Sequence, residues 1–229
     1  MRKLLLILIA LPMIGFGQNF KLDEIGLVFG PSHKISKHPL INLVPLERDG
    51  LIENLSHSEG LSLRYNITPS FSFNTQFLYK VNQSRFIHTI TFSDPLGTTI
   101  DQYKSYHISK QKYLNVPLLV EFNYIVNKFN IAFKLGNYIE YLIASSEKEE
   151  GSFLASVLDE EMNYYKKWDF GFMIGSGISY EFNNINISFD ILANAGTINT
   201  SLLKIDNGDT KHYNKSITGL IGISYKLKQ

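Results

Sequence analysis

Nine charged residues could act together, because each falls on the polar side of a segment in which apolar and polar residues alternate. Opposite charges that share an enclosed space can neutralise one another as a packed ion-pair network. They can also line a narrow polar path for water or small ions, and the excess of acids in this set would favour cations. The nine residues are Glu24, Arg64, Lys80, Glu121, Lys134, Glu140, Asp169, Glu181 and Asp190.

The histidines and serines offer weaker signals for chemistry. Of the six histidines, only His33 and His38 have a spacing seen in zinc fingers, and the chain holds no cysteine to complete such a set. We therefore interpret the histidines as solvated loop residues and expect no metal and no other cofactor. The nearest approach to a nucleophile-elbow motif is Gly175-Ser176-Gly177, whose serine falls on the apolar side of its segment. The sequence predicts a protein that is not an enzyme.

Eight segments after Phe20 carry the alternation, which is typical of strands whose two faces meet different surroundings. One face is mostly apolar, and the other is mostly small, polar or charged. The eight expected strands are Leu22–Gly30, Leu61–Ile67, Phe71–Val81, Leu114–Tyr124, Ile131–Tyr141, Trp168–Phe182, Ile185–Ala195 and Ile217–Leu227.

The links between these strands alternate between long and short. Tight links are expected at Asn66–Ser70, Tyr124–Phe129 and Phe182–Asn184. Outer-membrane barrels place short turns in the periplasm and long loops outside the cell, with both chain ends in the periplasm. We therefore predict an all-β fold, an eight-stranded antiparallel up-and-down transmembrane β-barrel with short periplasmic turns and long extracellular loops. The long links are Pro31–His57, Ser84–His107, Ile143–Lys166 and Gly196–His212.

A secreted β-sandwich would also alternate, and the aromatic residues favour the barrel over it. They gather at strand ends in two groups, as expected for rings placed at the two interfaces of a bilayer. The group near the short turns includes Tyr65, Phe122 and Tyr180, and the group near the long links includes Phe29 and Trp168. Because an eight-stranded barrel is only just wide enough for its own side chains, we favour the packed ion-pair network over the open path.

The beginning of the chain predicts its location. Met1-Arg2-Lys3 precedes an apolar run from Leu4 to Phe16, and small residues lie at Gly15 and Gly17. This is the pattern of a secretory signal peptide, and the run is shorter than the roughly 20 residues that a helix needs to cross a bilayer. We expect a cleaved signal peptide at residues 1–17, one barrel domain at residues 18–229, and a location in the outer membrane.

The turn between two strands allows a register to be predicted. If Tyr124 pairs with Phe129, Leu119 lies opposite Lys134 and Glu121 lies diagonally from that lysine. Long side chains at diagonal positions can meet, so we expect an ion pair between Glu121 and Lys134. On this interpretation, Lys134→Glu destabilises the barrel.

Two strands resemble those of a known family. The run Tyr113-Leu114-Asn115-Val116-Pro117-Leu118-Leu119-Val120 and the segment from Trp168 to Tyr180, with its Asp169-Phe170-Gly171 start, are similar to strands of the PorT-like outer membrane β-barrel proteins of Bacteroidota-type bacteria. The resemblance implies an eight-stranded outer-membrane barrel, usually of unassigned role, and some relatives take part in a protein-secretion apparatus. The family's pattern marks structure, so it implies no functional residue here.

Two functions stay open. The first is a structural or interaction role in the cell envelope through the extracellular loops, and the alternative is a porin-like channel for small solutes or ions. The expected partners are outer membrane lipid and an envelope protein bound through the long loops. A net charge of +1 argues against nucleic acid as a partner, and we expect a monomer.

Overall fold

The computed structural model of this 229-residue chain describes residues 21–35, 48–54, 56–93, 99–150, 165–200, 204–205, 208–209 and 213–227. The expected signal peptide at residues 1–17 lies outside the described residues. Across the described part of the chain, no helix has the length and apolar character needed to span a membrane.

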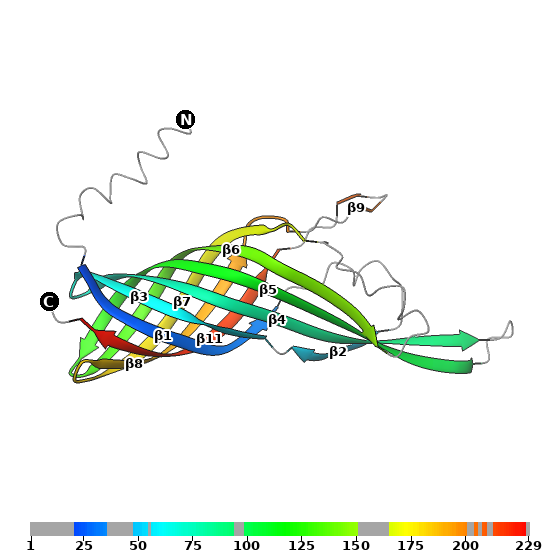
Figure 1. The fold of residues 1–229 in the computed structure, drawn as a ribbon, viewed down its shortest axis with the longest axis horizontal. Helices are drawn as coiled ribbons and strands as arrows, with labels where there is room; N and C mark the ends of the chain where they lie inside the picture. The colour runs from blue at the N-terminus through cyan, green and yellow to red at the C-terminus, as the bar shows by residue number, and fades with distance from the viewer. Residues whose placement is uncertain are drawn as a thin grey trace, which may run out of the picture.

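Eight strands form a closed antiparallel ring, which confirms the predicted barrel (Figure 1). The order around the ring is β1, β3, β4, β5, β6, β7, β8 and β11, and β11 closes the ring by pairing with β1. The alternation of apolar and polar residues produces this closure, because the barrel leaves no unpaired edge within the apolar zone. The ring strands are β1 (Lys21–Lys34), β3 (Ser56–Thr68), β4 (Phe71–Ser93), β5 (Thr99–Val126), β6 (Phe129–Glu150), β7 (Trp168–Phe182), β8 (Ile185–Gly196) and β11 (Lys215–Lys226).

Three tight turns lie at one end of the barrel, together with the start of β1 and the end of β11 (Figure 1). We call this the turn end, and the opposite end the loop end. Asn127 and Asn183 each begin a two-residue turn with a positive φ, 55° and 56° respectively. Asparagine tolerates this left-handed conformation better than most residues, which explains its place at both turns.

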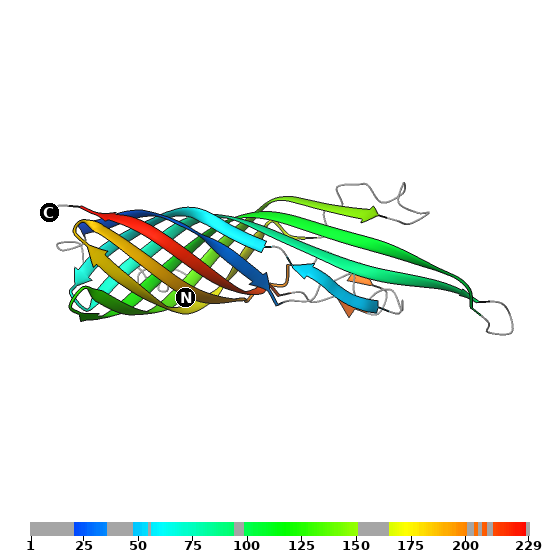
Figure 2. The same cartoon turned by 90° about the horizontal axis from the view of Figure 1, so that it is seen from below.

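The sheet continues well past the barrel at the loop end. Strands β4 and β5 stay paired as far as Ser93 and Thr99, and Figures 1 and 2 show this hairpin projecting along the long axis. The expectation of a loop at Ser84–His107 is therefore wrong, and so is that of a loop at the start of Ile143–Lys166, because β6 runs to Glu150. Two further pieces lie at this end: β2 (Arg48–Asn54), which pairs with β4, and the short pair β9 (Lys204–Ile205) and β10 (Gly208–Asp209).

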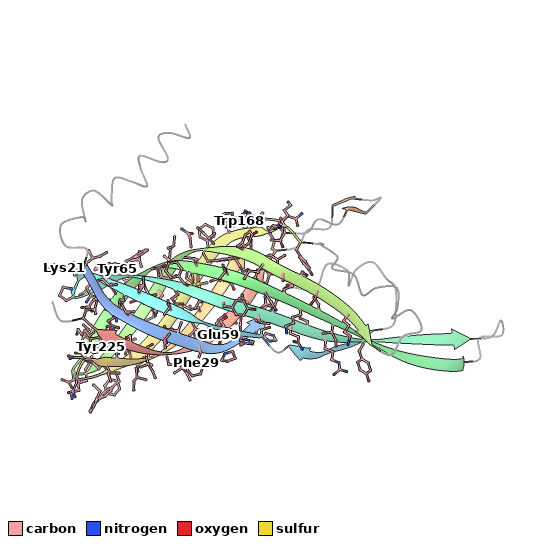
Figure 3. All side chains as sticks on the ribbon, viewed as in Figure 1. Lys21, Phe29, Glu59, Tyr65, Trp168 and Tyr225 are labelled. Atoms are coloured by element: carbon pink, nitrogen blue, oxygen red, sulfur yellow. The ribbon has the colours of Figure 1, made fainter. Side chains whose placement is uncertain are left out.

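The outer surface of the barrel is apolar, whereas the inward positions are mostly polar. Large apolar side chains such as Phe172 and Ile174 are more than half exposed, at 64% and 61%. Aromatic rings lie at both ends of this apolar belt, with Tyr65 and Tyr225 toward the turn end and Trp168 toward the loop end (Figure 3). From Leu114 to Tyr124 a tilted strand rises about 26 Å, which matches the roughly 25 Å apolar band of an outer-membrane barrel.

Candidate functional site

The half of the lumen nearer the turn end holds a chain of buried ion pairs. Glu121 lies at its centre: its Oε2 is 3.0 Å from Nε of Arg64, and its Oε1 is 2.9 Å from Nζ of Lys134. Lys134 Nζ also lies 2.7 Å from Oδ1 of Asp190, and Arg64 Nη1 lies 3.4 Å from Oε1 of Glu24. We call these five residues, which come from β1, β3, β5, β6 and β8, the turn-side network.

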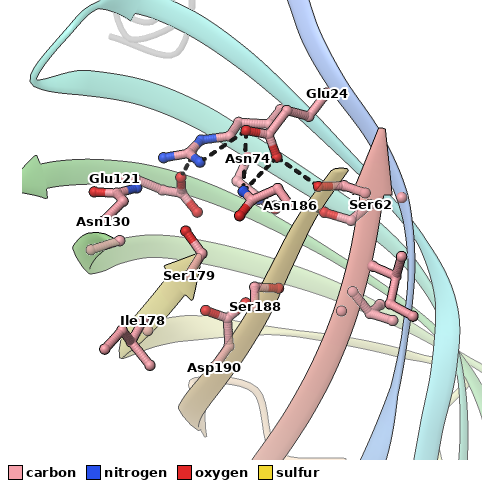
Figure 4. A pocket seen from close by; sticks show the side chains of 18 of the residues that line it. Glu24, Ser62, Asn74, Glu121, Asn130, Ile178, Ser179, Asn186, Ser188 and Asp190 are labelled. Atoms are coloured by element: carbon pink, nitrogen blue, oxygen red, sulfur yellow. Dashed lines mark hydrogen bonds and ion pairs between the residues drawn. The ribbon is translucent and has the colours of Figure 1, made fainter. Parts of the chain in front are cut away.

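Neutral side chains complete the hydrogen bonding of this network. Ser72 donates its hydroxyl to Oε2 of Glu121, and Asn186 and Ser224 donate to Oε2 of Glu24 at 3.0 and 2.7 Å. Figure 4 shows Glu24, Glu121, Asn186 and Asp190 around a cavity of about 40 Å³. That volume holds only a few water molecules. Carboxylates, cations, hydroxyls and amides surround the cavity, so the charges of its walls largely compensate one another.

The half of the lumen nearer the loop end holds a second network of different character. Lys80 Nζ lies 3.4 Å from Oε1 of Glu140, and that carboxylate also accepts a hydrogen bond from Asn115. Asp169 sits opposite Glu140 in the register of β6 and β7. Its Oδ2 accepts hydrogen bonds of 2.9 Å from two neutral donors, the hydroxyl of Tyr138 and the amide of Asn214. We call Lys80, Glu140 and Asp169 the loop-side network.

An apolar layer separates the two networks. Its seven members form one contiguous buried cluster, and Leu119 and Leu220 are 0% exposed. The eighth ring strand contributes Gly60 at this level, where a Cβ would lie 1.9 Å from the carbonyl oxygen of Phe77. A side chain there would collide with the neighbouring backbone, so glycine allows β3 to pass close to β4. The layer consists of Val28, Leu78, Leu119, Tyr138, Met173, Leu192 and Leu220.

The order of these levels repeats along the strands. On β5 the inward side chains run from Asn115 on the loop side, through Leu119 in the layer, to Glu121 on the turn side. On β8 the corresponding order is Asn194, Leu192 and Asp190. The layer thus crosses the lumen as a continuous apolar barrier. Such a barrier disfavours a dissolved ion, because a charge loses its hydration without gaining a partner.

Eight of the nine charged residues singled out in the sequence lie in the two networks. The ninth, Glu181, is placed differently: it lies at the exposed turn-end rim, where its carboxylate is 3.0 Å from Nζ of Lys226. Glu181 thus lines the open mouth of the lumen and not its enclosed part, because its strand ends at that rim. Sequence reasoning also missed Asp23, which is 6% exposed beside a register shift between Leu22 and Glu24.

The predicted register of the β5–β6 hairpin is off by two residues. Glu121 lies directly opposite Lys134, and Leu119 lies opposite Gly136. The reason is the turn: Asn127 adopts a positive φ, so the strands continue to Val126 and Phe129 and the turn needs only two residues. The direct pairing brings the two charges closer than the diagonal pairing would.

The histidine and serine candidates do not converge. His33 and His57 lie in β1 and β3, not in loops, and His38 lies outside the described residues. Ser176 is exposed on the outer, apolar face of β7. Within the described ranges, no three histidine or acidic side chains gather in a way that could hold a metal ion.

A closed antiparallel barrel with an apolar outer belt and a polar, filled interior is a transmembrane β-barrel of the outer-membrane type. The chain belongs to the family described as outer membrane protein beta-barrel domain, whose model matches residues 54–195. The protein is accordingly an outer membrane protein, with the turn end in the periplasm and the loop end outside.

Solved outer-membrane barrels are similar in fold at low sequence identity. The outer membrane protein OprG of Pseudomonas aeruginosa matches with a TM-score of 0.47 and 12% identity, covering 93% of this chain and 99% of its own. Ail of Yersinia pestis, crystallised with a heparin analogue, matches with a TM-score of 0.42 and 13% identity, over 90% and 100% of the two chains. The outer membrane protease OmpT of Escherichia coli gives a TM-score of 0.39 and 10% identity, over 90% and 97%. No curated protein matches the chain.

Proposed function

We propose that the protein is a sealed, non-enzymatic barrel that presents its extracellular sheet to a partner in the cell envelope. The apolar layer carries this proposal, because its seven buried side chains lie between the two polar networks of the lumen. If the lumen is closed, binding to a partner must use the parts of the chain that extend beyond the membrane.

The projecting hairpin is the element best placed for such a contact. Beyond Val81, β4 continues for about 40 Å of strand up to Ser93, paired throughout with β5. A rigid paired sheet costs less conformational entropy to bind than a free loop does. Membership of the PorT-like subgroup, supported by the strand beginning at Tyr113 and by the one beginning at Trp168, fits a role of this kind within an envelope assembly.

Planar-bilayer recordings test closure. The refolded protein should give no conductance steps, whereas large steady steps would exclude a sealed barrel and favour the porin-like alternative. The double variant Leu119→Ala and Leu220→Ala removes two side chains of the layer and should introduce small steps. Its control is Leu118→Ala and Ile221→Ala, which alters the adjacent outward residues, 37% and 44% exposed, and should stay silent.

A trimmed barrel tests the interaction. Phe86 and His107 face one another in the β4–β5 register, so residues 87–106 can be replaced by an Asn-Gly turn without changing the ring. The trimmed protein should keep its heat-resistant folded form but lose the envelope partners that cross-link to the full chain in cells. Retention of the same partners after trimming would exclude the hairpin as the binding element.

A further inference from the structure

A second cavity lies in the periplasmic mouth of the barrel, beside the turn-side network. Its volume is about 110 Å³, and it shares Glu24, Arg64, Asn130 and Asn186 with the smaller cavity of Figure 4. A cavity of this size holds several water molecules or one small organic molecule. We call it the mouth cavity, and its wall also includes Asp23, Asn66, Asn123, Lys128, Glu181 and Lys226.

Asp23 lines the mouth cavity because of a register shift in β1. Leu22 pairs with Tyr65 and Glu24 pairs with Arg64, so Asp23 is an extra residue with no counterpart on β3. In a regular strand, successive side chains point to opposite faces of the sheet. A bulge can redirect a side chain, and here the two successive carboxylates of Asp23 and Glu24 are both buried.

The carboxylate of Asp23 forms no ion pair within the described residues. Its Oδ2 accepts a hydrogen bond of 2.7 Å from the neutral amide of Asn66. Two cations of the wall, Arg64 and Lys226, form their ion pairs with other acids. Lys128 also lines the cavity, but its side chain is exposed to water in the turn. Because Asp23 is only 6% exposed, its charge favours the entry of a cation.

Two amide oxygens of the wall also lack a donor. Arg64 donates to Oδ1 of Asn123, which fixes that oxygen as an acceptor, because a guanidinium group can only donate. Asn130 donates its Nδ2 to the same oxygen at 3.0 Å. Asn186 is oriented by Glu24, whose two carboxylate oxygens lie 3.0 and 3.3 Å from its Nδ2. The remaining Oδ1 atoms of Asn130 and Asn186 are buried and have no hydrogen-bond donor among the described residues.

The buried groups that lack a partner in the described wall are therefore acceptors, one carboxylate and two amide oxygens. Such a set suits a species that carries both positive charge and N–H donors, because charge-assisted hydrogen bonds are the stronger ones. Asn186 is 7% exposed, so bulk water has little access to its oxygen. A metal ion is a poorer match, since no three acidic or histidine side chains of the described residues gather to hold one.

We propose that the mouth cavity binds the protonated amino group of a small free molecule that enters from the periplasm. An ammonium group supplies one positive charge and three donors, which are what Asp23 and the oxygens of Asn130 and Asn186 lack. A short alkyl chain fits the remaining volume. The site lies at the opposite end of the barrel from the projecting hairpin, so it is independent of the proposed envelope partner.

The test is an NMR titration of the full refolded chain, isotopically labelled and held in a neutral detergent, with putrescine. The side-chain amide signals of Asn130 and Asn186 should shift and saturate, whereas that of Asn115 on the loop side should not move. Asp23→Asn should bind at least about tenfold more weakly, because hydrogen bonds to charged groups are each worth about that factor or more. The control Glu59→Gln removes an exposed carboxylate near the loop end and should bind like the wild type.

Two analogues of putrescine separate charge from hydrogen bonding. Butanediol has the same length without charge, and fully N-methylated putrescine keeps both charges without N–H donors, so each should bind about tenfold more weakly. Equal binding of either analogue, or shifts confined to the loop side, would overturn the proposal. If Nα-acetyl-lysine amide binds more tightly than putrescine, the amine belongs to a peptide and the assignment to a free molecule is wrong. Should Asp23→Asn fail to fold, the analogues decide the same question with the wild type.

Discussion

Both polar halves of the lumen bury carboxylates, but the two halves stabilise those carboxylates with different groups. On the turn side each acid of the network has a cation within reach, and Lys134 is shared between Glu121 and Asp190. On the loop side Asp169 is instead held by the neutral groups of Tyr138 and Asn214. The turn-side network depends on charge compensation, whereas the loop-side network depends mainly on hydrogen bonds.

Tyr138 links the apolar layer to the loop-side network. Its ring belongs to the apolar layer, and its hydroxyl donates to Asp169 on the loop side. The layer therefore supports the network beyond it as well as separating the halves. Removing a charged group should therefore lower the free energy of unfolding more on the turn side than on the loop side. Shortening an apolar side chain should lower it most in the layer.

The largest effect is expected for Lys134→Glu, because it places a third carboxylate between Glu121 and Asp190. Removing one partner from a buried ion pair typically costs 3–5 kcal/mol, and the reversed charge adds repulsion. The heat-resistant folded band on an unboiled gel should disappear, or its urea midpoint should fall steeply. Lys128→Glu makes the same change in the exposed turn and should fold normally. An unchanged midpoint for Lys134→Glu would show that the turn-side network does not stabilise the barrel.

A smaller loss is expected for Leu119→Ala, which opens a void in the apolar layer. Leu119 is 0% exposed, and a buried leucine replaced by alanine costs about 2–5 kcal/mol. The neighbouring Leu118→Ala faces lipid, which can fill the space, so its cost should be clearly lower. Urea titration of both variants in the same vesicles measures the difference. Equal losses would mean that the layer is not tightly packed.

The sequence predicts the barrel well because strands that face lipid on one side and the lumen on the other must alternate apolar and polar residues. The expected strand Trp168–Phe182 coincides with β7, and all eight expected strands lie in the ring. The projecting hairpin was missed because the expected strands were limited to the length that crosses a bilayer. Strands β4 and β5 continue beyond that length. The run from Phe86 to Phe92 nevertheless consists largely of aromatic and β-branched residues, a signal for strand that was readable.

The interior is harder to read from the sequence, because contacts across the lumen depend on the registers of all strands together. One asparagine turn moved Glu121 from a diagonal to a direct position, and one bulge turned Asp23 inward. The apolar layer left a trace: Leu119, Met173 and Leu220 interrupt the polar faces of their strands. Within its own strand each of these apolar residues is an isolated exception to the polar pattern. Only the registers of all the strands together show that the three residues lie at one level of the lumen.

The contrast between the halves is tested most directly by two matched substitutions, Asp190→Asn and Asp169→Asn. Asp190→Asn removes one of the two carboxylates beside Lys134, and Glu121 still compensates that lysine, so the folded barrel should lose about 2 kcal/mol, less than when a buried charge loses its only partner. Asp169→Asn keeps a carbonyl that can accept from both Tyr138 and Asn214, so it should cost about 1 kcal/mol. Urea midpoints at one pH compare the two. The reverse order would show that the loop side also relies on charge.

The smallest effect is expected at the rim. Glu181 and Lys226 form an ion pair whose side chains are 47% and 39% exposed. Water and salt screen such a pair, and exposed pairs contribute between nothing and about 1 kcal/mol. Glu181→Gln should therefore change the unfolding free energy by no more than about 0.5 kcal/mol, and added salt should remove most of that change. A loss comparable to that of Asp190→Asn would place Glu181 within the turn-side network after all. The enclosed charges would then extend to the periplasmic mouth, and the lumen would be stabilised by charge pairs along its whole turn-side half.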